Sequence, residues 1–503
     1  MDFVNMLRIY LERLASTIDN RVFSEDPTSR SLYRLIQQAM ALISRHIDKI
    51  GYVLIPILAF ALRLYNYAII PSPIATTDEY AFAWCGWSLI HGQKPTSWSL
   101  LPAYTRWQPV EWRGISFRIV SPWFDHPPLF CLVVGVAATI GGAPTMFDCA
   151  LEFMRIPSIL FGTLSTVLVY SLGSRLYNKG IGMVSAVLYA TVPVIVITNR
   201  LAVAENMLTV LLLLAIYATL QYIEDNETKY LIIILISAPS AILAKLPGVS
   251  VTIIVSIILF AYNYRKESLY VILSGILAIL GYLLYGLLLD WNLFVAVNTV
   301  QSERFTLHYK FFFDILTLGS SVTYTWIDGW IIWSWFALLY ASTKDKKQIL
   351  SIGAGMYIIT IILSAGFFAY YWYIFPLFPF FCLACGKYIN DLIKQPNIIF
   401  FLLFFVTAWL FIFLGIYSEI FHFIRIRTIY VSIARLILSG LFGVYVLHFV
   451  LRGRRTRAVC STVTVLLFSV FILVNIFVVI YAHEVLPLLD ELSRKIFTYY
   501  ELR

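Results

Sequence analysis

Residues 70–155 contain two polar blocks, Thr76-Thr77-Asp78-Glu79-Tyr80 and Trp123-Phe124-Asp125-His126-Pro127-Pro128-Leu129. This stretch has no apolar run long enough to cross a bilayer, although the rest of the chain is almost wholly apolar. Ionisable groups held at a membrane surface are costly to keep, so carboxylates and a histidine there are candidates for chemistry. The chain is therefore interpreted outward from this segment.

The composition predicts a polytopic helical membrane protein. The chain has 503 residues, of which 60% are hydrophobic and only 13% are charged, whereas a soluble domain has about a quarter charged. Apolar runs of roughly twenty residues recur without the short alternation of an outer-membrane barrel, so the spans are expected to be helices. The net charge of +9 is not attributed to nucleic-acid binding, because Lys and Arg lie in short connections between apolar runs.

The apolar runs predict about thirteen spans. They cover approximately residues 51–70, 156–172, 181–198, 206–222, 230–244, 249–262, 269–289, 327–340, 350–364, 373–388, 398–416, 430–450 and 459–481. Residues 127–140 are apolar but too short to span, so they are expected to be interfacial or re-entrant. Before the first span, residues 31–46 show helical amphipathic spacing, typical of a helix on the cytoplasmic membrane surface or of a solvated arm.

Orientation supports the interfacial assignment of residues 127–140. With the N-terminus inside, the basic connections 174–179, 264–266, 344–347 and 452–457 all fall in the cytoplasm, as the positive-inside rule requires. If residues 127–140 were counted as a span, all four basic connections would fall outside the cytoplasm. The same parity puts the long loop, Arg200, Glu205, Lys245, Arg304 and His308 on one external face.

Each of these residues also has an ordinary structural explanation. Thr76 to Glu79 fits a capping box in which Thr76 caps a helix over residues 80–90 and Glu79 reaches back, which leaves Asp78 free to face a site. Asp125 fits a helix N-cap before Pro127-Pro128, and His126 fits an interfacial polar residue.

The external connections leave similar alternatives open. Arg200 and Glu205 fit an internal ion pair, Lys245 a snorkelling lysine, and residues 303–310 a solvated loop. Taken together, however, these side chains describe a site with carboxylates for proton abstraction or metal binding and cations for phosphate.

The six cysteines indicate no disulfide framework. Cys382 and Cys385 have the spacing of a redox motif, but they lie in an apolar helical segment, which favours packing. Cys85 and Cys149 share the long loop, and the sequence leaves their pairing open.

At these residues the chain resembles the GT-C superfamily of membrane glycosyltransferases, in the branch of protein O-mannosyltransferases and aminoarabinose transferases (ArnT-like). The resemblance extends in order from residue 70 to residue 248 and is weaker beyond. The matching blocks are Asp78-Glu79, Asp125-His126-Pro127-Pro128-Leu129, Arg155-Ile156-Pro157-Ser158, Asn199-Arg200 with Ala204-Glu205-Asn206, Leu243-Ala244-Lys245 with Gly248, and the later Tyr371-Trp372-Tyr373 with Pro376 and Pro379.

The resemblance implies inverting transfer of a sugar from a dolichyl- or undecaprenyl-phosphate carrier to a hydroxyl on protein, lipid or glycan at the external face. It implies Asp78 as the base, with Glu79 and Asp125 as further catalytic carboxylates. His126, Arg200, Lys245 and Arg304 become candidate ligands of the carrier phosphate. Asp125, Glu205 and His308 are candidate ligands of a divalent metal, although Ala204-Glu205-Asn206 replaces the two acids of related oligosaccharyltransferases.

The resulting organisation has three parts. Residues 1–50 form a cytoplasmic amphipathic segment, residues 51–325 a GT-C catalytic core with external loop 71–155, and residues 326–503 the C-terminal helices with a short external tail. The enzyme is expected in the plasma membrane.

The alternative function is a transporter or lipid flippase, which would place ionisable residues in mid-span and in paired repeats, where the sequence has little beyond Arg63. A non-catalytic scaffold subunit would tolerate neutral residues at Asp78 and Asp125.

Overall fold

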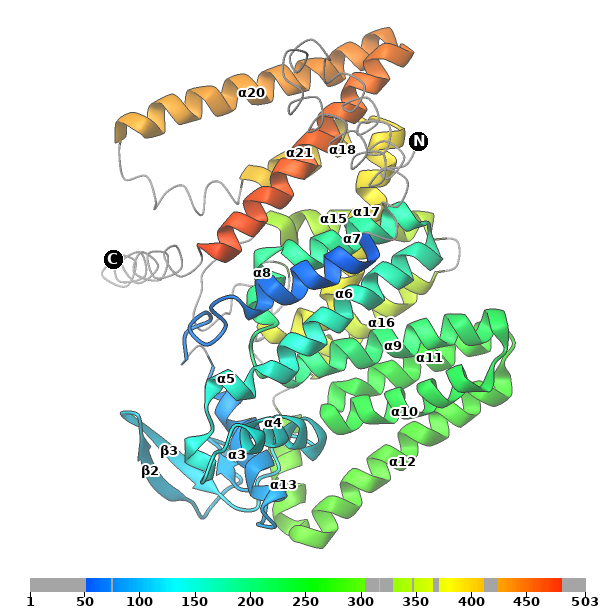
Figure 1. The fold of residues 1–503 in the computed structure, drawn as a ribbon. Coiled ribbons are helices and arrows are strands. Elements are labelled where there is room, and N and C mark those ends of the chain that lie inside the picture. Colours follow the sequence, from blue (N-terminus) through cyan, green and yellow to red (C-terminus); the bar gives the residue numbers. More distant parts are fainter. Residues whose placement is uncertain are drawn as a thin grey trace, which may run out of the picture.

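The computed structural model describes residues 51–73, 76–303, 316, 329–345, 348–364, 371–410 and 424–481. Within these ranges the chain consists of helices and one small three-stranded sheet. Helices α3 (Asp78–Ile90) and α4 (Pro128–Ile140) lie with the sheet at one end of the helical body, and α20 (Ile424–Leu451) lies at the other (Figure 1). The predicted N-terminal surface helix and the external tail fall outside the described residues.

The predicted apolar runs correspond to helices in the predicted order, beginning with Gly51–Leu64. Within the part of the chain that the structure describes, five helical segments are long and apolar enough to cross a membrane: Leu151–Leu176, Ala204–Asp225, Arg265–Leu289, Trp372–Lys394 and Arg454–Ile480. Among the described residues, the helices of the body after the long loop are α5 (Leu151–Met154), α6 (Ile156–Leu176), α7 (Lys179–Thr191), α8 (Pro193–Thr198), α9 (Ala204–Asp225), α10 (Thr228–Ala244), η2 (Leu246–Gly248), α11 (Val249–Ala261), α12 (Arg265–Leu289), α13 (Trp291–Ser302), α15 (Gly329–Lys344), α16 (Ile349–Ser364), η3 (Tyr371–Leu377), α17 (Phe378–Lys394), α18 (Ile398–Leu403), η4 (Phe404–Leu410), α20 and α21 (Arg454–Ile480).

One predicted span is broken in the structure. The run at residues 181–198 divides into α7 and α8 at Val192, because Pro193 has no N–H to continue the hydrogen bonding of α7 and instead starts a new helix. The break matters for the site, because α8 leads into the turn that carries Arg200 and then into α9, whose first turn carries Glu205.

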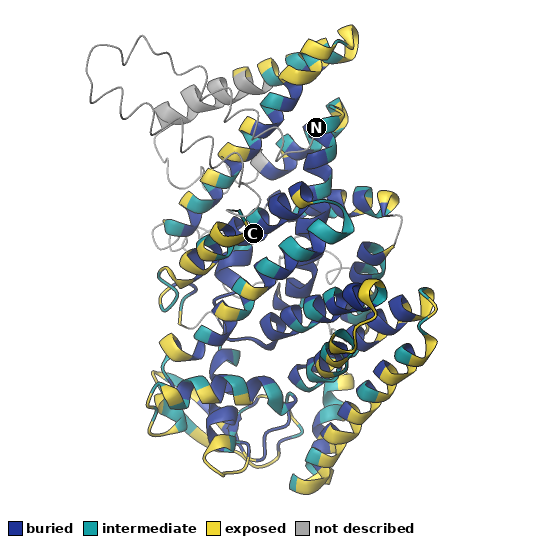
Figure 2. Ribbon diagram, turned by 45° about the vertical axis from the view of Figure 1, so that its right-hand side comes forward, coloured by how far each residue is buried: buried dark blue, intermediate teal, exposed yellow. Residues whose placement is uncertain are grey.

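Two helices form the centre of the body. In each long helix we compare the buried share of its most apolar stretch. That share is 78% in α9 and 89% in Trp372–Lys394, but only 28% in α12 and 39% in α21. Figure 2 shows buried residues gathered along the middle of the body and exposed ones at its periphery. Leu277 and Leu288 of α12 are 67% and 75% exposed, as expected for side chains that face lipid.

The long loop of residues 71–155 contains a sheet that was not predicted from the sequence. Strands β1 (Ser97–Trp98), β3 (Ile115–Val120) and β2 (Gln108–Trp112) pair antiparallel in that order, with Trp112 opposite Ile115. The two-residue turn between β2 and β3 has positive φ at Arg113 (50°) and Gly114 (76°), the geometry of a tight hairpin. An X-Gly pair between two alternating apolar runs was the signal for it.

Helix α4 packs along α3 and also contacts α10 and α6. With 13 residues it is about 20 Å long, too short for a hydrocarbon core of about 30 Å. Gly86 of α3 and Gly135 of α4 allow backbone contact, because a Cβ at Gly86 would lie 1.8 Å from the Cys131 carbonyl oxygen. The 3₁₀ turn η1 (Met146–Asp148) then leads back to the body. All six cysteines are free and buried, so Cys85 and Cys149 do not pair.

Candidate active site

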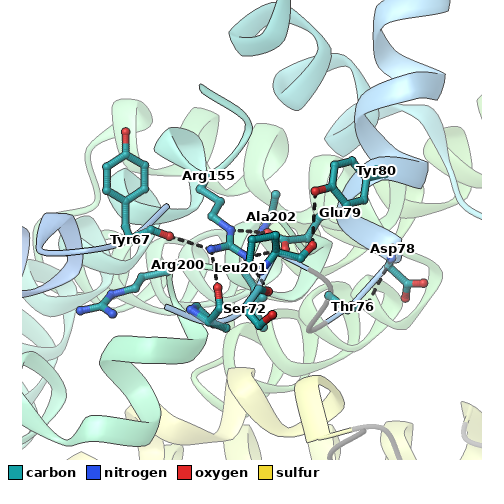
Figure 3. Close-up of polar contacts among 12 residues, drawn as sticks. Tyr67, Ser72, Thr76, Asp78, Glu79, Tyr80, Arg155, Arg200, Leu201 and Ala202 are labelled. Carbon is teal, nitrogen blue, oxygen red and sulfur yellow. Dashed lines mark hydrogen bonds and ion pairs between the residues drawn. The ribbon is translucent and has the colours of Figure 1, made fainter. Parts of the chain in front are cut away.

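A buried ion pair fixes the start of α3. Arg155 donates from Nε to Glu79 Oε1 (2.8 Å) and from Nη2 to Glu79 Oε2 (2.7 Å), and both side chains are fully buried. The amide of Ala202 also donates to Glu79 Oε1 (2.8 Å). Arg155 Nη1 donates further to the carbonyls of Tyr67 (2.6 Å) and Pro71 (2.9 Å) (Figure 3).

This pair joins four separate segments: the end of the first helix, α3, the start of α6 and the turn before α9. The capping-box prediction for Glu79 is wrong, because its carboxylate binds Arg155 and Ala202 and does not return to Thr76. The helix begins at Asp78, and Thr76 Oγ1 accepts from the Asp78 amide at 3.2 Å. We therefore treat Glu79 as a positioning residue rather than a catalytic one.

Asp78 lies in the first turn of α3, half-buried, and its side chain points away from the Glu79–Arg155 pair (Figure 3). Phe82, four residues on, shares its face of the helix. The imidazole of His126 stacks on the Phe82 ring with centroids 5.2 Å apart. The helix face that carries Asp78 therefore also receives His126.

Two tryptophans brace this region. Trp98 Nε1 in β1 donates to the Thr77 carbonyl, next to Asp78, at 3.0 Å, and Trp123 Nε1 donates to the Trp98 carbonyl at 3.0 Å. The sheet is thereby attached to both polar blocks. The sheet therefore connects the beginning of α3 with the segment before α4.

Asp125 is held by hydroxyl donors. Ser99 Oγ donates to Oδ2 (2.7 Å) and Tyr104 OH donates to Oδ1 (2.8 Å), while the Phe124 amide donates to the Tyr104 oxygen (2.8 Å). Burial and the neighbouring Asp125 carboxylate raise the pKa of Tyr104 well above its usual value, so the phenol stays protonated and keeps donating. The predicted N-cap role is wrong, because Pro127 occupies the N-cap position of α4 and makes no side-chain cap.

Helix α13 also reaches this block. Gln301 Nε2 donates to the Asp125 carbonyl at 2.6 Å. Gln301 precedes Arg304 by three residues, but Arg304 and His308 themselves lie outside the described residues. Their predicted roles as phosphate and metal ligands remain predictions.

Arg200 and Glu205 do not pair with each other, contrary to the simplest structural interpretation of their spacing. Arg200 donates to the carbonyls of Ile70 (3.0 Å) and Leu62 (2.7 Å), at the end of the first helix. Glu205 instead binds Lys245, which arrives from the end of α10, and both side chains are buried. Arg200 is therefore engaged with backbone carbonyls, whereas the Lys245 ammonium faces the Glu205 carboxylate.

The Lys245–Glu205 pair lies on the same end of the body as Asp78. Ala202, whose amide binds Glu79, precedes Glu205 by three residues. The Lys245 ammonium lies 4.9 Å from the Tyr373 ring centroid. The second oxygen of Glu205, Oε2, is buried and accepts no hydrogen bond from any described residue. The structure thus links Glu79, through the amide of Ala202, to the turn that leads into Glu205 and its partner Lys245.

The described residues do not form a metal site. Within the described ranges no three His, Cys, Asp or Glu side chains converge. Glu205 has an ammonium as its partner, and both oxygens of Asp125 already accept from hydroxyl groups. A divalent ion at either carboxylate would have to displace these donors.

Several of these contacts were not predicted. Arg155 was recognised only as part of a motif, while Ser99, Tyr104 and Gln301 were not singled out. The available signal for Arg155 was a lone arginine just before an apolar run of about twenty residues, which requires a buried or interfacial partner.

Comparison with known proteins bears on these residues. Residues 125–285 match the model of the family described as dolichyl-phosphate-mannose-protein mannosyltransferase. The predicted family resemblance is confirmed. The matched region includes Asp125, His126, Arg155, Glu205 and Lys245 and begins after Asp78. No curated protein matches the chain.

Two groups of solved structures are similar to this chain. One is ArnT from Cupriavidus metallidurans bound to undecaprenyl phosphate, with 13% identity and a TM-score of 0.48, covering 85% of this chain and 77% of that one. The other is the oligosaccharyltransferase AglB from Archaeoglobus fulgidus in complex with an inhibitory peptide and a dolichol-phosphate, with 12% identity and a TM-score of 0.45. That match covers 70% of this chain and about half, 51%, of AglB.

The family match supports a helical membrane glycosyltransferase. The contacts of Arg63 bear on the alternative of a transporter. Arg63, the mid-span charge expected of a transporter, is fully buried and donates to Asn199 Oδ1 (2.9 Å) and the Tyr189 carbonyl (2.9 Å). Its guanidinium joins two helices of the core.

Proposed function

We propose that this protein transfers a sugar from a polyprenyl-phosphate carrier to a hydroxyl acceptor at the external membrane face, with Asp78 as the base. One observation carries the proposal. The Glu79–Arg155 pair fixes the first turn of α3, and Asp78 points away from that pair on the helix face that receives His126. A carboxylate at the fixed start of a helix, one turn before the ring on which an imidazole stacks, is suited to accept a proton from a bound hydroxyl.

The reaction requires one base and an anionic leaving group. Asp78 accepts the proton of the acceptor hydroxyl as its oxygen bonds to the anomeric carbon. The bond from that carbon to the phosphate oxygen breaks, and its electron pair leaves with the polyprenyl phosphate. Attack from the face opposite the phosphate inverts the anomeric centre, and no second carboxylate is needed as acid because cations stabilise the phosphate.

His126 and Lys245 are the described residues that we assign to the phosphate, with Arg304 as the third expected ligand. Lys245 now binds Glu205, so a carrier phosphate entering the site would replace one anion by another beside the same ammonium. The positive-inside rule supports an external location for this end of the body and a cytoplasmic N-terminus, in the plasma membrane. The acceptor is protein, lipid or glycan.

The donor class is tested with purified protein in detergent or liposomes. Radiolabelled sugars on dolichyl phosphate and undecaprenyl phosphate, together with the matching nucleotide sugars, are offered with a panel of hydroxyl acceptors. We expect label to move only from a polyprenyl phosphate. Movement of intact lipid across the liposome bilayer without loss of label would identify a flippase and overturn the proposal.

The role of Lys245 gives a separate prediction. Replacing Lys245 by Met should raise the KM for the lipid donor by about 10- to 100-fold, because a charge-assisted hydrogen bond contributes about 1.5–3 kcal/mol. Glu205→Gln should lower that KM, since it removes the carboxylate that competes for the ammonium. Initial rates across a series of donor concentrations measure both effects.

The exposed Lys266→Met variant is the matched control and should leave the donor KM unchanged. Because Lys245→Met also leaves Glu205 buried without a cation, the Glu205→Gln/Lys245→Met double variant is included to restore neutrality. If the double variant is stable and binds donor as the wild type does, Lys245 acts only in folding.

A further inference from the structure

A second basic site lies at the end of the body away from α3 and α4. A cavity of about 390 Å³ opens between the start of α18, the end of α20 and the start of α21. It is lined by Asn397, Ile399, Tyr445, His448, Arg452 and Arg457, among others. Figure 1 shows α18 and the α20–α21 turn at the opposite end from α3 and α4. This volume falls within the range of small-molecule sites, about 300–1,000 Å³.

The walls of the cavity are held in place by contacts that need no ligand. The rings of Tyr445 and Phe401 stack with centroids 4.0 Å apart, and Tyr445 OH lies 2.5 Å from Thr464 Oγ1. His448 Nδ1 lies 2.8 Å from Thr456 Oγ1, which ties α20 to α21 across the turn. The cavity is therefore a preformed feature of the helix packing.

The positive charge at this site has no carboxylate partner among the described residues. The turn carries Arg452, Arg454, Arg455 and Arg457, and residues 424–481 contain no Asp or Glu. None of these arginines forms an ion pair with a carboxylate in the described ranges of the chain. An anion from outside the chain is the natural counter-charge.

The surroundings of the cavity indicate the kind of anion. Leu447, Phe449 and Val450, from the last turns of α20, are 51%, 65% and 67% exposed, and Ile399 on the other side is 62% exposed. Exposed apolar side chains of this kind are suited to contact acyl chains, whereas the arginines lie beyond the end of the apolar helix. A ligand that contacts the apolar side chains through a tail and the arginines through a phosphate head would match both parts of the site.

We propose that this cavity binds the phosphate headgroup of an anionic phospholipid of the cytoplasmic leaflet, with Arg452 and Arg457 as its direct ligands. The positive-inside rule assigns a turn with four arginines to the cytoplasmic side, where anionic lipids attract basic groups. The His448 imidazole completes the lining, and the lipid tails lie along the exposed end of α20. The site is separate from the carrier site and does not depend on the proposed transfer reaction.

Native mass spectrometry of the full chain in a non-ionic detergent tests the proposal. Phosphatidylglycerol, phosphatidylcholine and inorganic phosphate are titrated separately against the wild type, an Arg452→Gln/Arg457→Gln variant and an Arg454→Gln/Arg455→Gln variant. The last is a matched control, because it removes the same charge from the same turn at residues that do not line the cavity.

We expect one tightly bound phosphatidylglycerol in the wild type and in the control. Its affinity should fall about tenfold more in the Arg452→Gln/Arg457→Gln variant than in the control, since only the former loses hydrogen bonds to the phosphate. Equal losses in the two variants would show diffuse surface attraction and overturn the site. Equal binding of phosphatidylcholine, or inorganic phosphate binding as tightly as the lipid, would overturn the lipid assignment. Unchanged sugar transfer in these variants separates this result from the carrier site.

Discussion

Sugar transfer by the Asp78→Asn variant is expected to be about 100- to 10,000-fold slower than by the wild type, the usual contribution of a general base. Asparagine is nearly isosteric, so the first turn of α3 keeps its shape, but the amide cannot accept the acceptor proton. The KM for the lipid donor should change little, because the phosphate ligands are elsewhere. A kcat effect without a KM effect is the signature of a group that acts in the transition state.

The matched control for Asp78→Asn is Asp148→Asn, which neutralises an exposed carboxylate of the same external loop. Both variants are compared at saturating donor after a thermal unfolding scan shows the wild-type midpoint. If folded Asp78→Asn transferred sugar at the wild-type rate, Asp78 would not be the base. Asp125, held by Ser99 and Tyr104, would then be the next candidate.

Glu79→Gln is expected to destabilise the protein by about 3–5 kcal/mol, because it leaves the buried Arg155 guanidinium without its counter-charge. The loss should appear as a lower midpoint of thermal unfolding. Activity would fall only in proportion to the fraction of protein that unfolds. This outcome separates a positioning carboxylate from a catalytic one, which would lose kcat at an unchanged midpoint.

A double-mutant cycle gives the matched test for this pair. In Glu79→Gln/Arg155→Met both charges are removed, and we expect recovery of part of the stability lost in either single variant. Glu111→Gln, at an exposed carboxylate of β2, should leave the midpoint unchanged. Additive losses in the cycle would contradict a direct coupling between Glu79 and Arg155.

Much of the fold followed from the lengths of the apolar runs. Helices such as α6, α9 and α12 lie where twenty-residue runs predicted them, because every backbone polar group in lipid must be satisfied within the helix. The hairpin of β2 and β3 was missed because its alternation is short and its turn, Arg113-Gly114, lies in an aromatic loop.

The candidate site was predicted in outline but not in its pairings. Glu79 was assigned to a cap three residues away, whereas its partner Arg155 is 76 positions distant. An ion pair with Arg200 was one of the alternatives left open for Glu205, whereas Glu205 binds Lys245 from another helix. Local spacing favours near neighbours, but a buried charge binds whichever opposite charge the packing brings to it.

The order of residues alone was enough to predict a helical membrane chain, a short apolar helix at α4 and a common external face for the scattered acids and bases. Hydrophobicity and positive charge act through the bilayer, which treats each segment separately, so these features need no knowledge of neighbouring helices. Only the tertiary structure decided which carboxylate is held by Arg155 and which, Asp78, is turned away from it. The choice is made by helices packed side by side, since an ion pair between distant residues exists only once the body has folded.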